Sequence, residues 1–226
     1  MTETAPPVIA IDGPAASGKG TIAQGIAQAL RFHYLDSGSL YRLVALCALE
    51  TGIALDDAAR LSATAEELAS VFVGDRILLS GVDVTSAIRS PEVSAAASQV
   101  AVHSGVRRAL LARQQAFRRP PGLVADGRDM GTVVFPGARL KVYVTASAEE
   151  RARRRYKQLI EKGNPVILSS LLRDIQERDA RDGGRTTAPL RPAADAVILD
   201  TTGMSIADSI AFLLQRYRAL EAGGNQ

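Results

Sequence analysis

Short apolar runs recur along the chain, and segments with helical periodicity separate them. Runs typical of buried strands occupy residues 8–11, 123–125, 141–145 and 196–199, with a weaker one at 33–35. This alternation predicts an α/β fold: a parallel sheet flanked by helices. In such sheets ligands bind beyond the carboxyl ends of the strands. Attention therefore falls on the residues after three of these runs, DG at 12–13, DSG at 36–38 and DGRD at 126–129.

Residues 56–120 interrupt the alternation. They read as a helix over 57–70, a hairpin in VFVGDRILLS with Gly74 and Asp75 at its turn, and helices starting at Pro91 and Gly105. We interpret this stretch as an insertion in a single domain that covers residues 1–226.

A second interruption, EKGNPVIL at 161–168, joins two arginine-rich segments. Arg151, Arg154 and Arg155 of the first share a helical face, and the second carries ERDARDGGR. A solvated charged face would explain either helix alone. Two such helices beside a short loop favour a mobile lid, at about residues 156–170, that closes cations over phosphates.

Composition limits the class of protein. The 226 residues are 46% hydrophobic and 23% charged, which is ordinary for a soluble globular chain. No apolar stretch approaches the about 18 residues that span a bilayer, and MTETAPP at the start lacks the pattern of a secretion signal, so we expect a cytoplasmic protein and no membrane partner. With Cys47 as the single cysteine and His33 and His103 as the histidines, we expect no disulfide and no protein-borne metal site.

Arginine dominates the basic residues. Only four of the 27 are lysines, at 19, 141, 157 and 162, and the net charge is +3. Arginine binds phosphate through two hydrogen bonds, although the base composition of the source genome would produce the same bias. Few aromatic residues (4%), no basic tail and 24 interspersed acidic residues argue against a nucleic-acid partner.

The segment VIAIDGPAASGKGT at 8–21 carries the clearest chemistry. An apolar strand leads into a glycine-rich loop, a lysine and then a periodic helix, which is the order found in phosphate-binding loops. An ordinary turn between strand and helix would also contain glycines, but it would not require that order. We predict that ATP or GTP phosphates bind the nine loop residues Gly13, Pro14, Ala15, Ala16, Ser17, Gly18, Lys19, Gly20 and Thr21.

Gly20 departs from the usual loop pattern, which has Ser or Thr after the lysine to bind magnesium. The hydroxyl comes one residue later, at Thr21. We therefore expect Mg²⁺, as the companion of ATP, to be held through water.

Five stretches together resemble one family. They are GPAASGKGT, LDSGSLYR at 35–42, SAAASQVA at 94–101, ADGRDMGTVVFP at 125–136 and ERDARDGGR at 177–185. The loop with its Lys-Gly-Thr ending is similar to that of the nucleoside monophosphate kinases, and the set closely resembles bacterial cytidylate kinases from residue 8 to about residue 200. This resemblance implies a P-loop kinase that transfers the γ-phosphoryl group of ATP to CMP or dCMP. It also implies a monomer, and it identifies residues 56–120 as the part that binds the monophosphate.

The resemblance also implies residue roles. Lys19 follows the γ-phosphoryl group, Arg128 and Arg178 act on the phosphates, and Asp126 orients magnesium through water. The acceptor nucleotide is bound by the set Ser37, Arg42, Ser98, Arg107, Arg128, Asp129, Arg178, Asp182 and Arg185. For any one arginine taken singly, a surface salt bridge explains it equally well.

Two other classes remain open from the residues alone. A nucleotide-binding regulatory module would keep the loop but would need no second cluster of arginines and aspartates. Another P-loop small-molecule kinase would keep both clusters but would lack a carboxylate that reads the base.

Overall fold

A computed structural model describes residues 5–161 and 163–223 of the chain. Its contacts divide it into two compact units, one made of Met1–Leu35 with Phe117–Gln226 and the other of Asp36–Ala116. Lys162, which falls in the predicted lid, and residues 1–4 of the leading segment lie outside the described residues.

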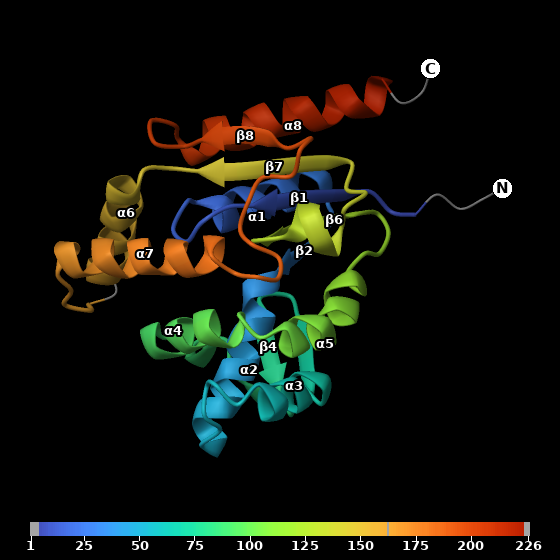
Figure 1. The fold of residues 1–226 in the computed structure, drawn as a ribbon. Coiled ribbons are helices and arrows are strands. Elements are labelled where there is room, and N and C mark those ends of the chain that lie inside the picture. The colour runs from blue at the N-terminus through green and yellow to red at the C-terminus, as the bar shows by residue number, and fades with distance from the viewer. Residues whose placement is uncertain (1–4, 162, 224–226) are drawn as a thin grey trace. The chain divides into compact units, whose positions relative to one another are not determined.

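The first unit is built on a five-stranded sheet with the order β2-β6-β1-β7-β8 (Figure 1). β1 pairs in parallel with both β6 and β7, and β7 pairs in parallel with β8. Every residue of β1 and β6 is buried, as the uninterrupted apolar runs predict. The α/β prediction is therefore confirmed, with strands β1 (Val8–Asp12), β2 (His33–Asp36), β6 (Leu123–Gly127), β7 (Leu140–Thr145) and β8 (Val197–Asp200).

Helices α1 (Lys19–Leu30) and α8 (Ile206–Gly223) pack against each other beside this sheet. α1 buries Ile22 and Ile26, which lie one helical turn apart on one face, in the same core cluster as Ile9 and Ile11 of β1. Tyr217 of α8 is buried in that cluster as well. The helix that follows the glycine loop is thus fixed to the central strand by apolar packing.

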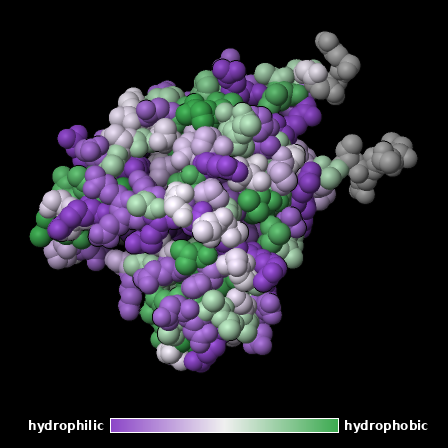
Figure 2. All heavy atoms as spheres, in the orientation of Figure 1, coloured by the Kyte–Doolittle hydropathy of each residue, from purple (hydrophilic) through white to green (hydrophobic). Residues whose placement is uncertain are grey.

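Helices α6 (Ala148–Glu161) and α7 (Leu168–Gly183) follow the carboxyl end of β7 and pack against each other (Figure 1). The two arginine-rich helices are therefore confirmed. At their far ends Ile160 and Ile167 are exposed, and Figure 2 shows hydrophobic and hydrophilic residues interspersed over that end of the pair. The closing motion of a lid over residues 156–170 stays a prediction.

The second unit combines four helices with a small antiparallel sheet of order β3-β4-β5. The hairpin is confirmed, with Gly74 in the left-handed conformation at its turn (φ 57°). The helix expected over 57–70 is shorter: Asp57 caps it by accepting from the Arg60 N–H, and Ser70 already pairs with Leu79 in the hairpin. The elements are α2 (Ser37–Thr51), α3 (Ala58–Glu66), β3 (Ser70–Val73), β4 (Arg76–Leu79), β5 (Val82–Asp83), η1 (Ala87–Arg89), α4 (Pro91–Val100) and α5 (Ser104–Gln115).

This unit begins at Asp36, earlier than the insertion predicted over 56–120. The difference arises because α2 packs against α3 and α4, so it shares their core rather than that of the large sheet. Among the described residues, no helix combines the length and the apolar character required to cross a membrane.

Candidate active site

The glycine loop joins β1 directly to α1. A side chain at Gly13 would place its Cβ 2.0 Å from the Val144 carbonyl oxygen of β7, so only glycine allows the strand to turn there. Gly18 is left-handed (φ 86°) and caps α1, which begins at Lys19. Because no side chain caps the α1 N-terminus, its first N–H groups are available to an anion. The Lys19 ammonium donates to the Pro14 carbonyl over 3.3 Å, within the loop.

Side chains from α6 and from the segment after β8 hold the carbonyl groups of the loop. Arg151 donates to the Ala15 carbonyl (3.2 Å), and Arg154 donates to the Ser17 carbonyl (3.4 Å) and to the Thr201 carbonyl (2.6 Å). The buried Thr201 hydroxyl donates to the Ser17 carbonyl as well, over 3.1 Å. Because these side chains bond the carbonyls of Ala15 and Ser17, the N–H groups of the loop can face a phosphate.

These contacts change the interpretation of two arginines. Arg151 is 5% exposed and forms a two-pronged ion pair with Asp179 of α7, at 3.1 and 2.6 Å. Arg154 pairs with Glu150 one turn earlier on its helix. Arg151 therefore connects the phosphate loop with α7, and Arg154 connects the loop with the segment after β8. The sequence pattern indicated basic residues on this helix, and the structure places two of them against the glycine loop, but the pattern could not show that Asp179 and Thr201 are their partners.

Gly20 lies beside the carboxylate of Asp126, at the end of β6. A Cβ at Gly20 would come 3.2 Å from Asp126 Oδ2, tighter than most contacts of this kind. The Tyr34 hydroxyl donates to the other oxygen of Asp126 over 3.4 Å. A serine or threonine at position 20 would therefore crowd the Asp126 carboxylate, which explains why glycine suits this position. Thr21 is exposed on the first turn of α1.

Asp182, near the end of α7, holds two predicted site arginines. Arg128 donates through Nε to Asp182 Oδ2 over 2.7 Å, and Arg185 donates to Oδ1. Burial alone would raise the pKa of Asp182, but the positive charges of Arg128 and Arg185 outweigh burial and lower it to about 2. Arg178, one turn earlier on α7, adds to this effect. The structure therefore brings together these four residues of the predicted set.

Asp129 follows Arg128 and is 3% exposed. Its carbonyl accepts from the N–H groups of Val133 and Val134, which belong to a single π-helical turn, η2 (Met130–Val134). The carboxylate of Asp12 accepts hydrogen bonds from the first two N–H groups of the same turn, those of Met130 and Gly131. Sequence reasoning pointed to Asp12 as a strand-end residue but assigned it no role.

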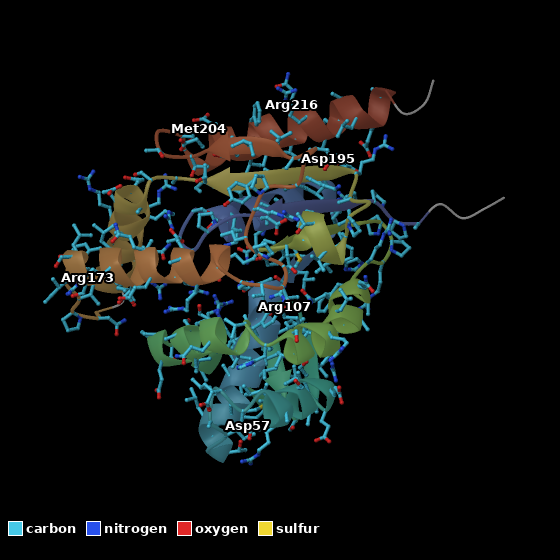
Figure 3. All side chains as sticks on the ribbon, in the orientation of Figure 1. Asp57, Arg107, Arg173, Asp195, Met204 and Arg216 are labelled. Carbon is cyan, nitrogen blue, oxygen red and sulfur yellow. The ribbon has the colours of Figure 1, made fainter. Side chains whose placement is uncertain are left out.

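Four predicted acceptor residues lie in the second unit. Ser37 and Ser98 are buried, at 3% and 4% exposure, on α2 and α4. Arg42 pairs with Asp36 over 3.3 Å. Arg107, labelled in Figure 3, extends from α5, donates to the Ala101 carbonyl and lies over the Tyr41 ring at 5.6 Å. Their joint use with the residues of the first unit stays a prediction.

The residues without an assigned role bond to the backbone or lie in apolar surroundings. His33 and His103 contact the carbonyls of Pro120 and Leu55, at 2.9 and 2.8 Å. Burial raises the pKa of the Cys47 thiol, which disfavours its reactive thiolate form. Over residues 5–161 and 163–223, no group of three or more His, Cys, Asp or Glu residues could hold a metal ion.

The buried strand β1 leads through the glycine loop to a lysine at the N-terminus of a helix, and the buried Asp182 gathers Arg128, Arg178 and Arg185 in a second charged cluster. Such a combination is typical of a P-loop kinase. Residues 9–219 match the family model for cytidylate kinase. The chain is 56% identical over 214 residues to a cytidylate kinase of Burkholderia cenocepacia and 55% identical to one of Paraburkholderia phymatum, in each case covering 95% of this chain and 94% of the relative. The chain belongs to the cytidylate kinase family, so the resemblance seen in its motifs is confirmed.

Solved structures add support for the fold alone. An uncharacterized protein from Eubacterium ventriosum has a TM-score of 0.50 and 9% identity, with coverage of 94% of this chain and 98% of that one. At that identity the likeness concerns the α/β architecture and not the chemistry.

Proposed function

We propose that this chain transfers the γ-phosphoryl group of ATP to CMP or dCMP and releases ADP with CDP or dCDP. Membership of the cytidylate kinase family over residues 9–219 carries the proposal. The phosphate loop and the cluster around Asp182 support it, because a transfer between two phosphate groups requires a binding site for each.

The loop residues Gly13 to Thr21 serve as the ATP phosphate site in this proposal. The N-terminus of α1 supplies N–H groups and a partial positive charge, and Lys19 supplies a full charge that moves with the γ-phosphoryl group. The contact of the Lys19 ammonium with the Pro14 carbonyl, over 3.3 Å, keeps this charge at the loop.

Magnesium is assigned to the ATP phosphates and, through water, to Asp126. The residues fit this arrangement, since Asp126 lies next to Gly20 of the loop and is the carboxylate at the end of β6. A bound Mg²⁺ would neutralise negative charge on the β- and γ-phosphates. The protein would contribute one carboxylate and leave the remaining positions to phosphate and water.

Arg42 and Arg128 are assigned to the acceptor's phosphate, and Arg178 to the group in transfer. Asp182 and Arg185 are assigned to the sugar and phosphate of the acceptor, and Asp182 also holds Arg128 and Arg185 in place. The rest of the acceptor is assigned to Ser37, Ser98, Arg107 and Asp129. The acceptor's phosphate oxygen is itself the nucleophile, so the chemistry requires positioning and charge neutralisation rather than a covalent intermediate. Closure of residues 156–170 would exclude water, which otherwise competes for ATP. A monomer and a cytoplasmic setting complete the proposal.

A panel of acceptors tests the proposal. ADP formation from ATP is measured with CMP, dCMP, UMP, AMP and shikimate, and without an acceptor. The expected result is rapid ADP formation with CMP and dCMP alone. Faster turnover with shikimate or AMP would identify a different kinase. ADP formation that does not depend on any acceptor would contradict transfer and favour a regulatory nucleotide-binding module.

A further inference from the structure

Asp12 is a buried carboxylate without a role in the proposed chemistry. It ends the central strand β1, directly before Gly13, and is 3% exposed. In the register of the sheet it lies opposite Gly127 of β6, the residue before Arg128, and opposite Tyr143 of β7. Asp12 therefore lies between the phosphate loop, which follows it in the chain, and the DGRD segment, which lies beside it in the sheet.

Both oxygens of Asp12 bond to the backbone of that segment. Oδ1 accepts from the Met130 N–H over 2.7 Å, and Oδ2 accepts from the Gly131 N–H over 2.8 Å. Hydrogen bonds from N–H groups to a carboxylate are about twice as strong as those between neutral groups. These two N–H groups begin η2, so their orientation sets the direction of the backbone that leaves Arg128 and Asp129.

We propose that Asp12 is a positioning residue, which fixes the turn at Met130 and Gly131 and so orients Arg128 and Asp129 toward the acceptor nucleotide. The inference rests on the proposed function for what these two residues bind. Asp12 itself touches neither nucleotide in this account. It acts through the two N–H groups, at a distance from the transferring phosphoryl group.

The charge environment of Asp12 supports a functional reason for its burial. Burial raises the pKa of Asp12 to about 6, although the hydrogen bonds from Gly131 and Met130 lower it. Of the neighbouring charges, Asp129 raises this pKa further and Arg128 lowers it. Lys141 of β7 lies against Gly131 of the turn, and Tyr143 of β7 lies opposite Asp12 in the sheet.

Keeping this group ionised therefore opposes folding at neutral pH. A carboxylate that served stability alone would gain nothing from such a position, because an uncharged residue of the same shape would avoid the desolvation. Below pH 6 protonation removes the negative charge and makes one oxygen a hydroxyl, which is a weaker acceptor, so the bonds from the turn to Asp12 weaken.

Asp12→Asn tests the inference, because asparagine keeps the shape but turns an NH₂ group toward one of the two N–H donors. We expect kcat/KM for CMP to fall about 10- to 100-fold, because Arg128 and Asp129 would be displaced from the acceptor. The KM for ATP should change less than about threefold. The free energy of unfolding at neutral pH should stay equal or rise. Asp83→Asn is the matched control: Asp83 accepts from the Thr85 N–H in the hairpin of the second unit, and its loss should leave both constants unchanged.

Nuclear magnetic resonance gives a readout that does not depend on activity. In the wild-type protein the amide protons of Met130 and Gly131 should shift together in a pH titration, with a midpoint near pH 6. Asp12→Asn should abolish that transition and leave other amides of β1 unchanged.

Three results would overturn the inference. Unchanged kcat/KM for CMP in Asp12→Asn would do so while leaving the proposed function intact. An equal rise of the KM values for ATP and CMP, accompanied by a lower free energy of unfolding, would show that Asp12 only supports the fold. The absence of any pH-dependent shift shared by the Met130 and Gly131 amides and removed by Asp12→Asn would exclude a hydrogen bond from these two N–H groups to a titrating Asp12 carboxylate. Failure of the wild-type protein to phosphorylate CMP, with the amide titration present, would instead overturn the proposed function.

Discussion

Arg128 and Asp182 are 54 residues apart in the sequence, yet the Nε of Arg128 donates to Oδ2 of Asp182 over 2.7 Å. Asp182 also accepts from Arg185, so one buried carboxylate holds two of the cations assigned to the acceptor. The side chains of Asp182 and Arg185 are 4% and 3% exposed. Each cation is thereby fixed before the acceptor arrives, which reduces the reorganisation that transfer requires.

Asp182→Asn should lower both activity and stability. Breaking a buried pair leaves cations without their counter-charge, so we expect a loss of about 3 kcal/mol in the free energy of unfolding at pH 7. The loss in kcat/KM for CMP should be at least about 100-fold. Urea unfolding and steady-state kinetics measure the two effects. Asp195→Asn removes an exposed carboxylate that pairs with Lys141 and should change neither measurably; Asp195 is labelled in Figure 3.

The pH dependence of this effect has a defined sign. The pKa of Asp182 is about 2 in the folded protein and 3.8 in an unperturbed chain. Its ionised form therefore stabilises the fold above pH 3.8, by about 2 kcal/mol, and this contribution disappears as the pH falls through 2. The stability difference between the wild type and Asp182→Asn should shrink over that range. A difference that stays constant down to pH 2 would contradict the ion pair.

Lys19→Ala should abolish transfer and leave the fold intact. Lys19 begins α1 at a partly exposed position in the loop and lies outside the buried core, so we expect the fold to tolerate its loss. Removing one preorganised charge should reduce kcat at least about 100-fold. Circular dichroism and thermal unfolding check that the variant is folded. Arg216→Ala, which removes a cation on α8 that lies over the Phe212 ring, is the control and should keep its activity. Near-normal turnover of Lys19→Ala would exclude the phosphate-loop assignment.

Much of this fold follows from local pattern. The five strands of the large sheet, the helix after the glycine loop and the hairpin at Gly74 all come from apolar period and turn residues, which depend on near neighbours in the sequence. The start of the second unit is not evident from the sequence, because α2 follows β2 without a linker. Only the packing of α2 against α3 and α4 shows that it belongs to that unit. Sequence period does not encode which core a helix joins.

The sequence was sufficient to predict which types of residue form the site, but not which residues bond to one another. The basic character of Arg151 and Arg154 suggested a lid, whereas their bonds to Asp179, Thr201 and the loop carbonyls depend on contacts up to 137 residues apart. The turn η2 depends likewise on Asp12, which lies 118 residues from Met130. Such long-range bonds leave no periodic signal, so only a three-dimensional structure reveals them.

Gly20→Ala should weaken the use of magnesium. The added Cβ would lie 3.2 Å from Asp126 Oδ2, so the carboxylate has to move by a few tenths of an ångström. Since Asp126 is assigned to magnesium through water, we expect the Mg²⁺ concentration for half-maximal activity to rise about 3- to 10-fold. Gly137→Ala, whose Cβ meets open space, should show no change. An unaltered Mg²⁺ dependence in Gly20→Ala would contradict the role of Asp126.

Asp129 is assigned to the base of the acceptor because of the pattern that cytosine presents. Its exocyclic amine donates a hydrogen bond, and its ring nitrogen and carbonyl accept, whereas uracil has a carbonyl in place of the amine. A buried carboxylate accepts a hydrogen bond from the cytosine amine, whereas it would face the uracil carbonyl as one acceptor against another. Arg107, with Ser98, is assigned to the accepting edge, so Arg107→Ala should weaken CMP and UMP alike.

Asp129→Ala should therefore lower kcat/KM for CMP and narrow the preference for CMP over UMP. An unpaired carboxylate facing uracil in a desolvated site costs about 1.5 to 3 kcal/mol, which corresponds to a preference of about 10- to 150-fold. Asp129 is 3% exposed, so solvent offers a uracil carbonyl beside it no alternative partner. The measurement is the ratio of kcat/KM for CMP to that for UMP in the wild type and the variant. If Asp129 acts only as a charge beside Arg128, both substrates lose equally and the ratio stays unchanged, which would refute the assignment.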